Sequence, residues 1–146
     1  MEKVKLVDKG KIDLGEVIKA LKENLETSEY GAILCFIGVV RSIGHDGEKV
    51  KHLYYEVDEK HTLKFLENLR QKVLEENRGL AELIIYHAAG EVPPKKETVL
   101  IVAAGKHSED VFSGVRRALK GVKEEIPIWK KEITEKHSYW VGREKH

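Results

Sequence analysis

The stretch Gly121-Val122-Lys123-Glu124-Glu125-Ile126-Pro127-Ile128-Trp129-Lys130-Lys131-Glu132 joins a helix to a strand across a single proline. Pro127 cannot continue a helix, and it disfavours helical geometry at the residue before it. A helix that carries Lys123 must therefore end here, and a new element must carry Lys130. Because that element alternates apolar and polar residues, we expect a strand, so two ammonium groups can converge from different elements.

Lys123 and Lys130 can do chemistry only if one loses its proton, because an amine is a nucleophile or a base only when neutral, and its ordinary pKa is roughly 10.4. Partial burial beside a second cation lowers the pKa, which is the usual way a protein activates a lysine. Lys131 points to the opposite strand face from Lys130, whereas Glu132 shares the Lys130 face and can hold that ammonium in place. The alternative is a helix end followed by solvated lysines on an edge strand, a common protection against aggregation.

The rest of the chain predicts an α+β fold with one domain over residues 1–146. Apolar residues recur at helical spacing over 14–25, 60–77 and 107–124. Runs of β-forming residues predict strands at 3–7, 31–40, 50–57, 83–87, 98–103, 128–134 and 139–141. We expect 31–40 to be a central strand buried on both faces and 83–87 to pair with 98–103; if the loop after 31–40 is a hairpin, 50–57 runs antiparallel to 31–40. These elements make a mixed, largely antiparallel sheet with three main helices.

Composition limits the classes of function. A chain of 146 residues with 41% apolar content fits one domain with one sizeable core. Lys and Arg number 26 against 25 Asp and Glu, so no global basic field attracts nucleic acid or a membrane surface. The single cysteine, Cys35, lies in an apolar run and predicts a core thiol in a reducing compartment. Because the N-terminus lacks the apolar run of a signal peptide, we expect a cytoplasmic protein.

The polar residues that remain favour an anion site. Arg41 follows the apolar run 31–40 and opens a glycine-containing loop, where a guanidinium can clamp a phosphate or carboxylate, although a solvated arginine at a strand end is the alternative. His107 precedes the third helix. The sequence has no phosphate-cradling glycine loop and no paired cysteines, and its seven histidines lack recurrent ligand spacing. We therefore expect neither a metal nor a cofactor, and a local site built from Arg41, His107, Lys123 and Lys130.

The same residues resemble the large, catalytic subunit family of molybdopterin synthase. The resemblance runs from about residue 31 to 140, through Gly38-Val39-Val40-Arg41, His87-Ala88-Ala89-Gly90-Glu91 and His107, to the spacing of Lys123 and Lys130. It implies an α/β-hammerhead-like fold and sulfur transfer to cyclic pyranopterin monophosphate, which forms the dithiolene of molybdopterin. The sulfur would arrive as a thiocarboxylate on the Gly-Gly tail of a small ubiquitin-like partner subunit. Two large subunits would form a central homodimer within a heterotetramer, and the site would be completed across the dimer.

The resemblance also implies residue roles. Lys123 and Lys130 would be catalytic, Arg41 would bind an anion, and His107 would come from the other protomer. Phe36 and Leu119 would lie along the channel for the partner's tail.

The chain departs from the family at two positions. The family commonly has His-Arg at the positions of His87 and His107, whereas Ala88 and Ser108 follow here. We expect Lys106 to replace the missing positive charge. A lysine ammonium is a compact charge, however, and it lacks the two parallel N–H donors of an arginine guanidinium. This departure affects the expected affinity for substrate more than the chemistry.

The implied reaction suits these cations. A phosphate ester and a thiocarboxylate are both anions, and they share a low-dielectric pocket only when cations offset their charges. One lysine, transiently neutral, can act as a base or attack the acyl intermediate, while the other stays charged; the sequence leaves the order open. The competing hypothesis is a non-catalytic binding partner of the ubiquitin-like sulfur carrier. A nucleic-acid binder is disfavoured by the near-zero net charge.

Overall fold

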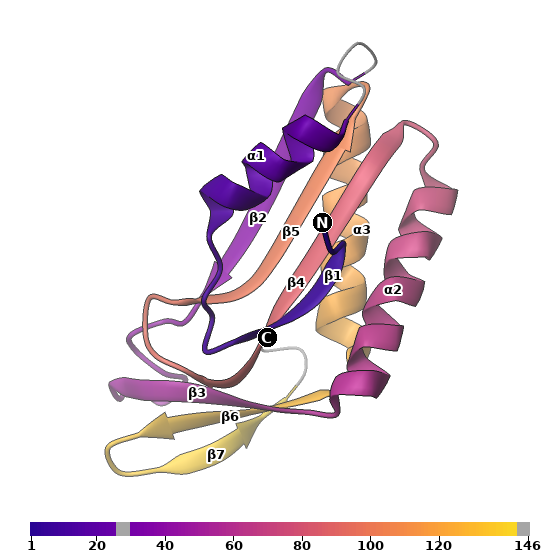
Figure 1. Cartoon of the computed structure of the whole chain (residues 1–146). Helices are drawn as coiled ribbons and strands as arrows, with labels where there is room; N and C mark the ends of the chain where they lie inside the picture. The colour runs from indigo at the N-terminus through magenta and orange to yellow at the C-terminus, as the bar shows by residue number, and fades with distance from the viewer. Residues whose placement is uncertain (26–29, 143–146) are drawn as a thin grey trace.

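A computed structural model of the chain describes residues 1–25 and 30–142 (Figure 1). The elements are β1 (Val4–Asp8), α1 (Leu14–Asn24), β2 (Ala32–Val39), β3 (Val50–Val57), α2 (Glu59–Glu76), β4 (Leu80–Val92), β5 (Glu97–Gly105), α3 (Ser108–Glu125), β6 (Ile128–Thr134) and β7 (Ser138–Val141). Each helix end lies within one residue of its predicted position. The α+β prediction is confirmed.

The sheet has seven strands in the order β2-β5-β4-β3-β6-β7, and β1 pairs with β4 outside this path. The β1–β4 pair is parallel and the other pairs are antiparallel, so the sheet is mixed as predicted. Residues 80–87 of β4 pair with β5, whereas its last residues, 90–92, pair with β3. Gly90, the first residue of the part that pairs with β3, has a φ of 75°, a conformation that glycine adopts without strain. β3, β6 and β7 therefore lie across the ends of β2, β4 and β5, like the head of a hammer (Figure 1).

The predicted position of the apolar run 31–40 was wrong. Within the described part of the chain, β2 is an edge strand whose one partner strand is β5, and none of its eight residues is buried. Nor does β3 pair with β2, because the intervening loop carries the chain from one half of the sheet to the other. β2 is apolar because partly buried residues on its two faces contact the two hydrophobic clusters. The pattern of side chains does not reveal whether a strand has neighbours on one side or on both.

Two hydrophobic clusters cover opposite faces of the sheet. Along β5, Val99, Ile101 and Ala103 face the larger cluster, which includes the apolar stripes of α2 and α3. The alternate residues of β5 face the cluster formed with α1. The molecule therefore has three layers, with α1 on one side of the sheet and the two long helices on the other (Figure 1).

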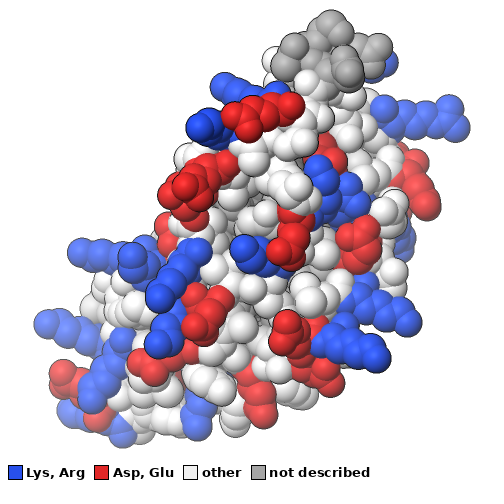
Figure 2. All heavy atoms as spheres, in the orientation of Figure 1, with Lys and Arg blue, Asp and Glu red and all other residues white. Residues whose placement is uncertain are grey.

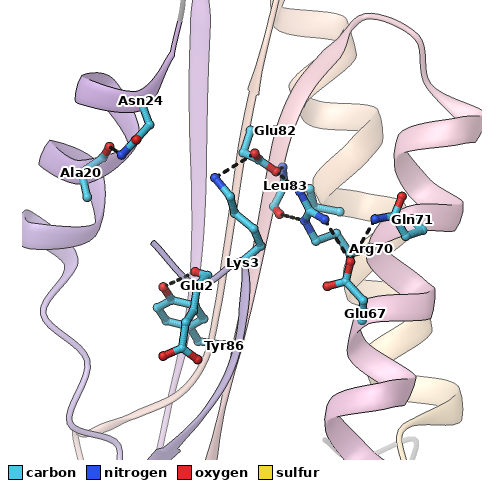
Figure 3. Close-up of polar contacts among 10 residues, drawn as sticks. All are labelled: Glu2, Lys3, Ala20, Asn24, Glu67, Arg70, Gln71, Glu82, Leu83 and Tyr86. Carbon is cyan, nitrogen blue, oxygen red and sulfur yellow. Dashed lines mark hydrogen bonds and ion pairs between the residues drawn. The ribbon is translucent and has the colours of Figure 1, made fainter.

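A polar network ties the N-terminus and α2 to β4 (Figure 3). Arg70 donates from Nε to the Leu83 carbonyl at 2.8 Å and also pairs with the Glu82 carboxylate. Lys3 Nζ contacts the other oxygen of Glu82 at 2.9 Å. Burial acts to raise the pKa of Glu82, but the hydrogen bonds from Arg70 and Lys3 outweigh it and lower that pKa. The ionised carboxylate therefore stabilises the fold. It also fixes β4, whose other end pairs with β3.

The surface carries both signs of charge. Lys and Arg side chains interleave with Asp and Glu over the face shown in Figure 2, without a large area of one sign. This distribution agrees with the formal net charge of +1 and gives no support to a nucleic-acid interface. None of the described helices has the length and apolar content needed to cross a membrane.

Candidate active site

A cavity of about 510 Å³ lies at the junction of the two halves of the sheet. It is lined from both halves and from the loop between them, by Val39, Arg41, His45, Val50, Leu53, Tyr55, Thr98, Lys130 and Glu132. The lining includes two cations and one carboxylate, so charged side chains converge here from distant parts of the chain.

Lys130 is the most perturbed of these groups. In β6, alternate residues point inward, so Lys130 is only 9% exposed while its neighbour Trp129 is 61% exposed. Burial lowers the pKa of Lys130 to about 8; the carboxylate of Glu132 opposes this shift and the charge of Arg41 adds to it. A lysine with such a pKa is neutral for an appreciable fraction of the time near neutral pH, which a base or nucleophile requires.

Arg41, His45 and Glu132 form a continuous polar chain beside Lys130. Glu132 is 3% exposed, and its Oε1 accepts from the His45 backbone N–H at 3.2 Å. His45 Nδ1 lies 3.0 Å from Glu132 Oε2, and His45 Nε2 lies 3.4 Å from Arg41 Nη2. Gly44 makes this approach possible, because a Cβ there would lie 1.9 Å from Glu132 Oε1. The loop after β2 and strand β6 together therefore form the charged side of the cavity, which consists of Arg41, His45, Lys130 and Glu132.

Two neutral aromatic rings, those of Tyr55 and His87, lie next to these charged side chains. The His87 ring meets the Tyr55 ring edge-on, with centroids 4.9 Å apart, and its Nδ1 donates to the Ala88 carbonyl at 2.8 Å. Burial lowers the pKa of His87 to about 4, partly offset by the Ala88 contact and reinforced by the charge of Lys130. Burial also favours the neutral form of Tyr55 and so raises its pKa, although a hydrogen bond with Thr98 opposes the change. These uncharged groups keep the local dielectric low, which strengthens interactions among the charges.

The sequence matches a known family along most of its length. A family model described as MoaE protein matches residues 7–125. The chain belongs to the MoaE family. The molybdopterin synthase catalytic subunit of Pyrococcus abyssi (strain GE5 / Orsay) is 30% identical to it over 122 residues, which are 84% of this chain and 81% of that protein. The resemblance found in the sequence is confirmed.

Solved structures of the family share the fold. The X-ray structure of molybdopterin synthase from Staphylococcus aureus has a TM-score of 0.84 at 29% identity, and the match covers 97% of this chain and 98% of that one. A protein–protein complex of subunits 1 and 2 of the molybdopterin-converting factor from Helicobacter pylori 26695 contains a chain with a TM-score of 0.77 at 21% identity. That match covers 96% of this chain and 90% of the other, and it shows the fold alone.

The structure brings together two of the residues that the MoaE resemblance assigns to the site, Arg41 and Lys130. Lys123 is exposed on the last turn of α3, and it is not among the described residues that line the cavity. We expected the two lysines to converge, so that each could be the second cation beside the other. Instead, Lys130 is buried and its neighbouring cation is Arg41.

Lys106 and His107 lie at the opposite end of β5 from the cavity. Thr98, near the start of β5, lines the cavity, and Gly105 ends the strand seven residues later. At about 3.3 Å per residue, the two ends are roughly 23 Å apart. Both Lys106 and His107 are exposed, and they cannot reach the cavity of their own chain.

The two residues assigned to the partner's tail lie on neighbouring elements of the MoaE fold. Phe36 on β2 and Leu119 on α3 are both half-buried, and both pack against the larger hydrophobic cluster. Both side chains are therefore partly exposed, and their contact with the partner's tail stays a prediction.

One group among the described residues has ligand atoms close enough together for a metal ion: Asp46, Glu48 and His137, whose atoms lie within 4.8 Å of one another. Hydrogen bonds within the chain account for this arrangement. Thr134 Oγ1 donates to Glu48 Oε2 at 2.9 Å, and His137 Nδ1 lies 3.0 Å from Glu48 Oε1. The group fastens the loop after β2 to the β6–β7 hairpin. That the protein uses no metal stays a prediction.

Sequence reasoning missed His45, Tyr55 and His87 as parts of the site. Tyr55 is the cross-strand partner of Lys130, a pairing that depends on the β3–β6 register. His45 had one usable signal, because it follows Gly44 in the loop that Arg41 opens. His87 lies inside a strand pattern that also suits a core histidine.

Proposed function

We propose that this chain is the catalytic subunit of molybdopterin synthase. It would transfer sulfur from the thiocarboxylated C-terminus of a small ubiquitin-like subunit to cyclic pyranopterin monophosphate, and so form the dithiolene of molybdopterin. Besides family membership, the observation that carries this proposal is the buried Lys130, whose pKa is lowered to about 8 in a cavity that also holds Arg41.

The cavity's charges fit two anionic reactants. A phosphate ester and a thiocarboxylate repel each other; Arg41 in the cavity would offset that repulsion together with a protonated Lys123, which lies outside the cavity lining. We assign the neutral role to Lys130, because burial favours loss of its proton, and it can then take a proton from an attacking group or attack the acyl carbonyl itself. We assign the charged role to Lys123, which is exposed at the end of α3 and can approach the tail of the bound partner.

A homodimer would supply the residues that one chain cannot bring to its own cavity. Lys106 and His107 lie roughly 23 Å from the cavity along β5, so they can act there only from a second protomer. β2 offers an unpaired sheet edge with exposed apolar residues, Ile37 at 38% and Val39 at 52%, of the kind that proteins cover. A central dimer with a small subunit at each end is the assembly we infer, and the two-subunit complex from Helicobacter pylori supports the small-subunit partner.

Complementation between inactive variants tests the shared site. Lys130→Ala and His107→Ala should each lose activity as pure dimers. When the two are mixed and exchanged, each mixed dimer has one site with Lys130 from one chain and His107 from the other. If half the dimers are mixed, about a quarter of all sites regain activity, by the symmetry of the dimer.

The outcomes separate the alternatives. Recovery of activity on mixing supports both catalysis and the shared site. A fully active His107→Ala protein would rule out the contribution of His107 across the dimer but leave catalysis in place. If the wild type binds the small subunit and gives no dithiolene, the chain is the non-catalytic partner, a function consistent with the missing arginines at Ala88 and Ser108.

A further inference from the structure

We propose that His45 is a positioning residue that holds the Arg41 guanidinium and the Glu132 carboxylate at opposite ends of one neutral imidazole. It would thereby fix the charges beside Lys130. The roles of Arg41 and Lys130 in this inference rest on the proposed function, but the contacts of His45 do not.

Hydrogen-bond chemistry fixes the state of the ring. A guanidinium has donors and no acceptor, so the contact of 3.4 Å with Arg41 Nη2 requires a lone pair on His45 Nε2. The proton of the neutral ring is then on Nδ1, which donates to Glu132 Oε2 at 3.0 Å. The backbone N–H of the same residue donates to Glu132 Oε1 at 3.2 Å. His45 therefore holds both carboxylate oxygens and orients one cation.

The loop that carries His45 is anchored at several points. Gly44 donates from its backbone N–H to the Glu48 carbonyl at 2.8 Å, and Val50 donates to the Ser42 carbonyl at 2.9 Å. The side chain of Glu48 is fastened to Thr134 on β6. The His45 side chain, 23% exposed, thus stands on a loop that is tied to the same strand as Glu132.

The two contacts of the ring have different consequences. Arg41, from the end of β2, faces Nε2, so loss of that contact releases the guanidinium and should weaken binding of an anionic substrate. Glu132, from β6, faces Nδ1, and its charge raises the pKa of Lys130 on the same strand. Loss of the Nδ1 donor concentrates the charge on the carboxylate, which favours the ammonium form of Lys130.

Two substitutions separate these contacts. In His45→Asn the amide nitrogen takes the place of Nδ1 and still donates to Glu132, but nothing reaches Arg41. In His45→Gln the longer side chain brings the amide oxygen to the place of Nε2, where it accepts from Arg41, while the donor at the Nδ1 position is lost. Lys49→Ala, in the same loop and exposed, is the matched control.

The test compares KM for cyclic pyranopterin monophosphate with the pH profile of kcat. We expect His45→Asn to raise KM about tenfold, because the released Arg41 guanidinium is no longer held in place for an anionic substrate, with the pH profile of kcat unmoved. We expect His45→Gln to leave KM within about twofold and to move the rise of kcat to higher pH. Equal changes in both variants, or no change in either, would overturn the proposal.

A second readout works without turnover. The rate at which an amine-specific reagent labels Lys130, followed by mass spectrometry across pH, reports the fraction of neutral amine. The labelling midpoint should rise in His45→Gln and stay in place in His45→Asn and Lys49→Ala. If the wild type gives no dithiolene while these midpoints behave as described, the proposed function fails and the positioning role of His45 survives. Identical midpoints in all three variants would contradict it.

Discussion

Replacing Lys130 with methionine should make the protein more stable at neutral pH, because the native state holds this ammonium where its charge is disfavoured. Methionine keeps an unbranched chain of similar size without the charge. Lys130 is 9% exposed, and burial lowers its pKa from 10.5 to about 8. Since one pKa unit corresponds to about 1.4 kcal/mol, the buried charge costs about 3 kcal/mol of folding free energy at pH 7.

The pH dependence of the difference gives the sharper test. Between pH 8 and 10.5, the window set by the two pKa values of Lys130, the unfolded chain binds a proton that the native chain has released. The wild type therefore gains stability as pH rises through this window. Because methionine binds no such proton, the stability advantage of Lys130→Met should shrink by about 2.5 kcal/mol between pH 7 and pH 10. Urea denaturation followed by circular dichroism at each pH measures both quantities.

Lys123→Met is the matched control for this experiment. Lys123 is exposed at the end of α3, so its replacement should change stability by no more than about 0.5 kcal/mol. A Lys130→Met protein that is no more stable than the wild type at pH 7, with a difference that stays constant to pH 10, would refute activation of Lys130 by burial.

Three further changes have defined outcomes. Arg41→Ala should raise KM for the phosphate-bearing substrate at least tenfold, since a charge-assisted contact is worth roughly 1.5–3 kcal/mol, and steady-state kinetics measures it. Lys106→Ala should add to that loss; a silent Lys106→Ala would mean that another cation replaces the family's arginine. Glu82→Gln should cost about 1–3 kcal/mol of stability at pH 7 in urea denaturation. Because the native pKa of Glu82 is lowered, that cost should fade as pH drops below 4.5, and a cost independent of pH would contradict the network.

The helices were predictable because their ends are encoded locally. Asp13 and Asp58 cap α1 and α2 by accepting from backbone N–H groups three residues later, each at 3.2 Å. Pro127 separates α3 from β6 in the same local way. Strand order was less accessible: β2 and the central strand β5 are both apolar runs, and only their partners distinguish an edge from a centre.

The site was predictable to the extent that single residues reveal it. Arg41 after an apolar run and Lys130 after a proline were both expected, and Lys130 has the expected lowered pKa. The cation whose charge helps to lower the pKa of Lys130 is Arg41, which the sequence did not reveal, because the approach of Arg41 depends on how the loop after β2 folds onto β6. Tyr55 and His45 reach the site through the same strand register and loop, which local sequence does not encode.

The most direct test of the central claim is single-turnover sulfur transfer with this chain, a thiocarboxylated small subunit and cyclic pyranopterin monophosphate, detecting the dithiolene product. Lys131 is the natural control, because it is the next residue on β6 and points to the other face, where its Nζ lies over the Trp140 ring, 5.4 Å from the ring centroid. The account predicts product from the wild type and from Lys131→Ala, and a rate at least about a hundredfold lower for Lys130→Ala. Wild-type rates in Lys130→Ala, or equal losses in both variants, would contradict it.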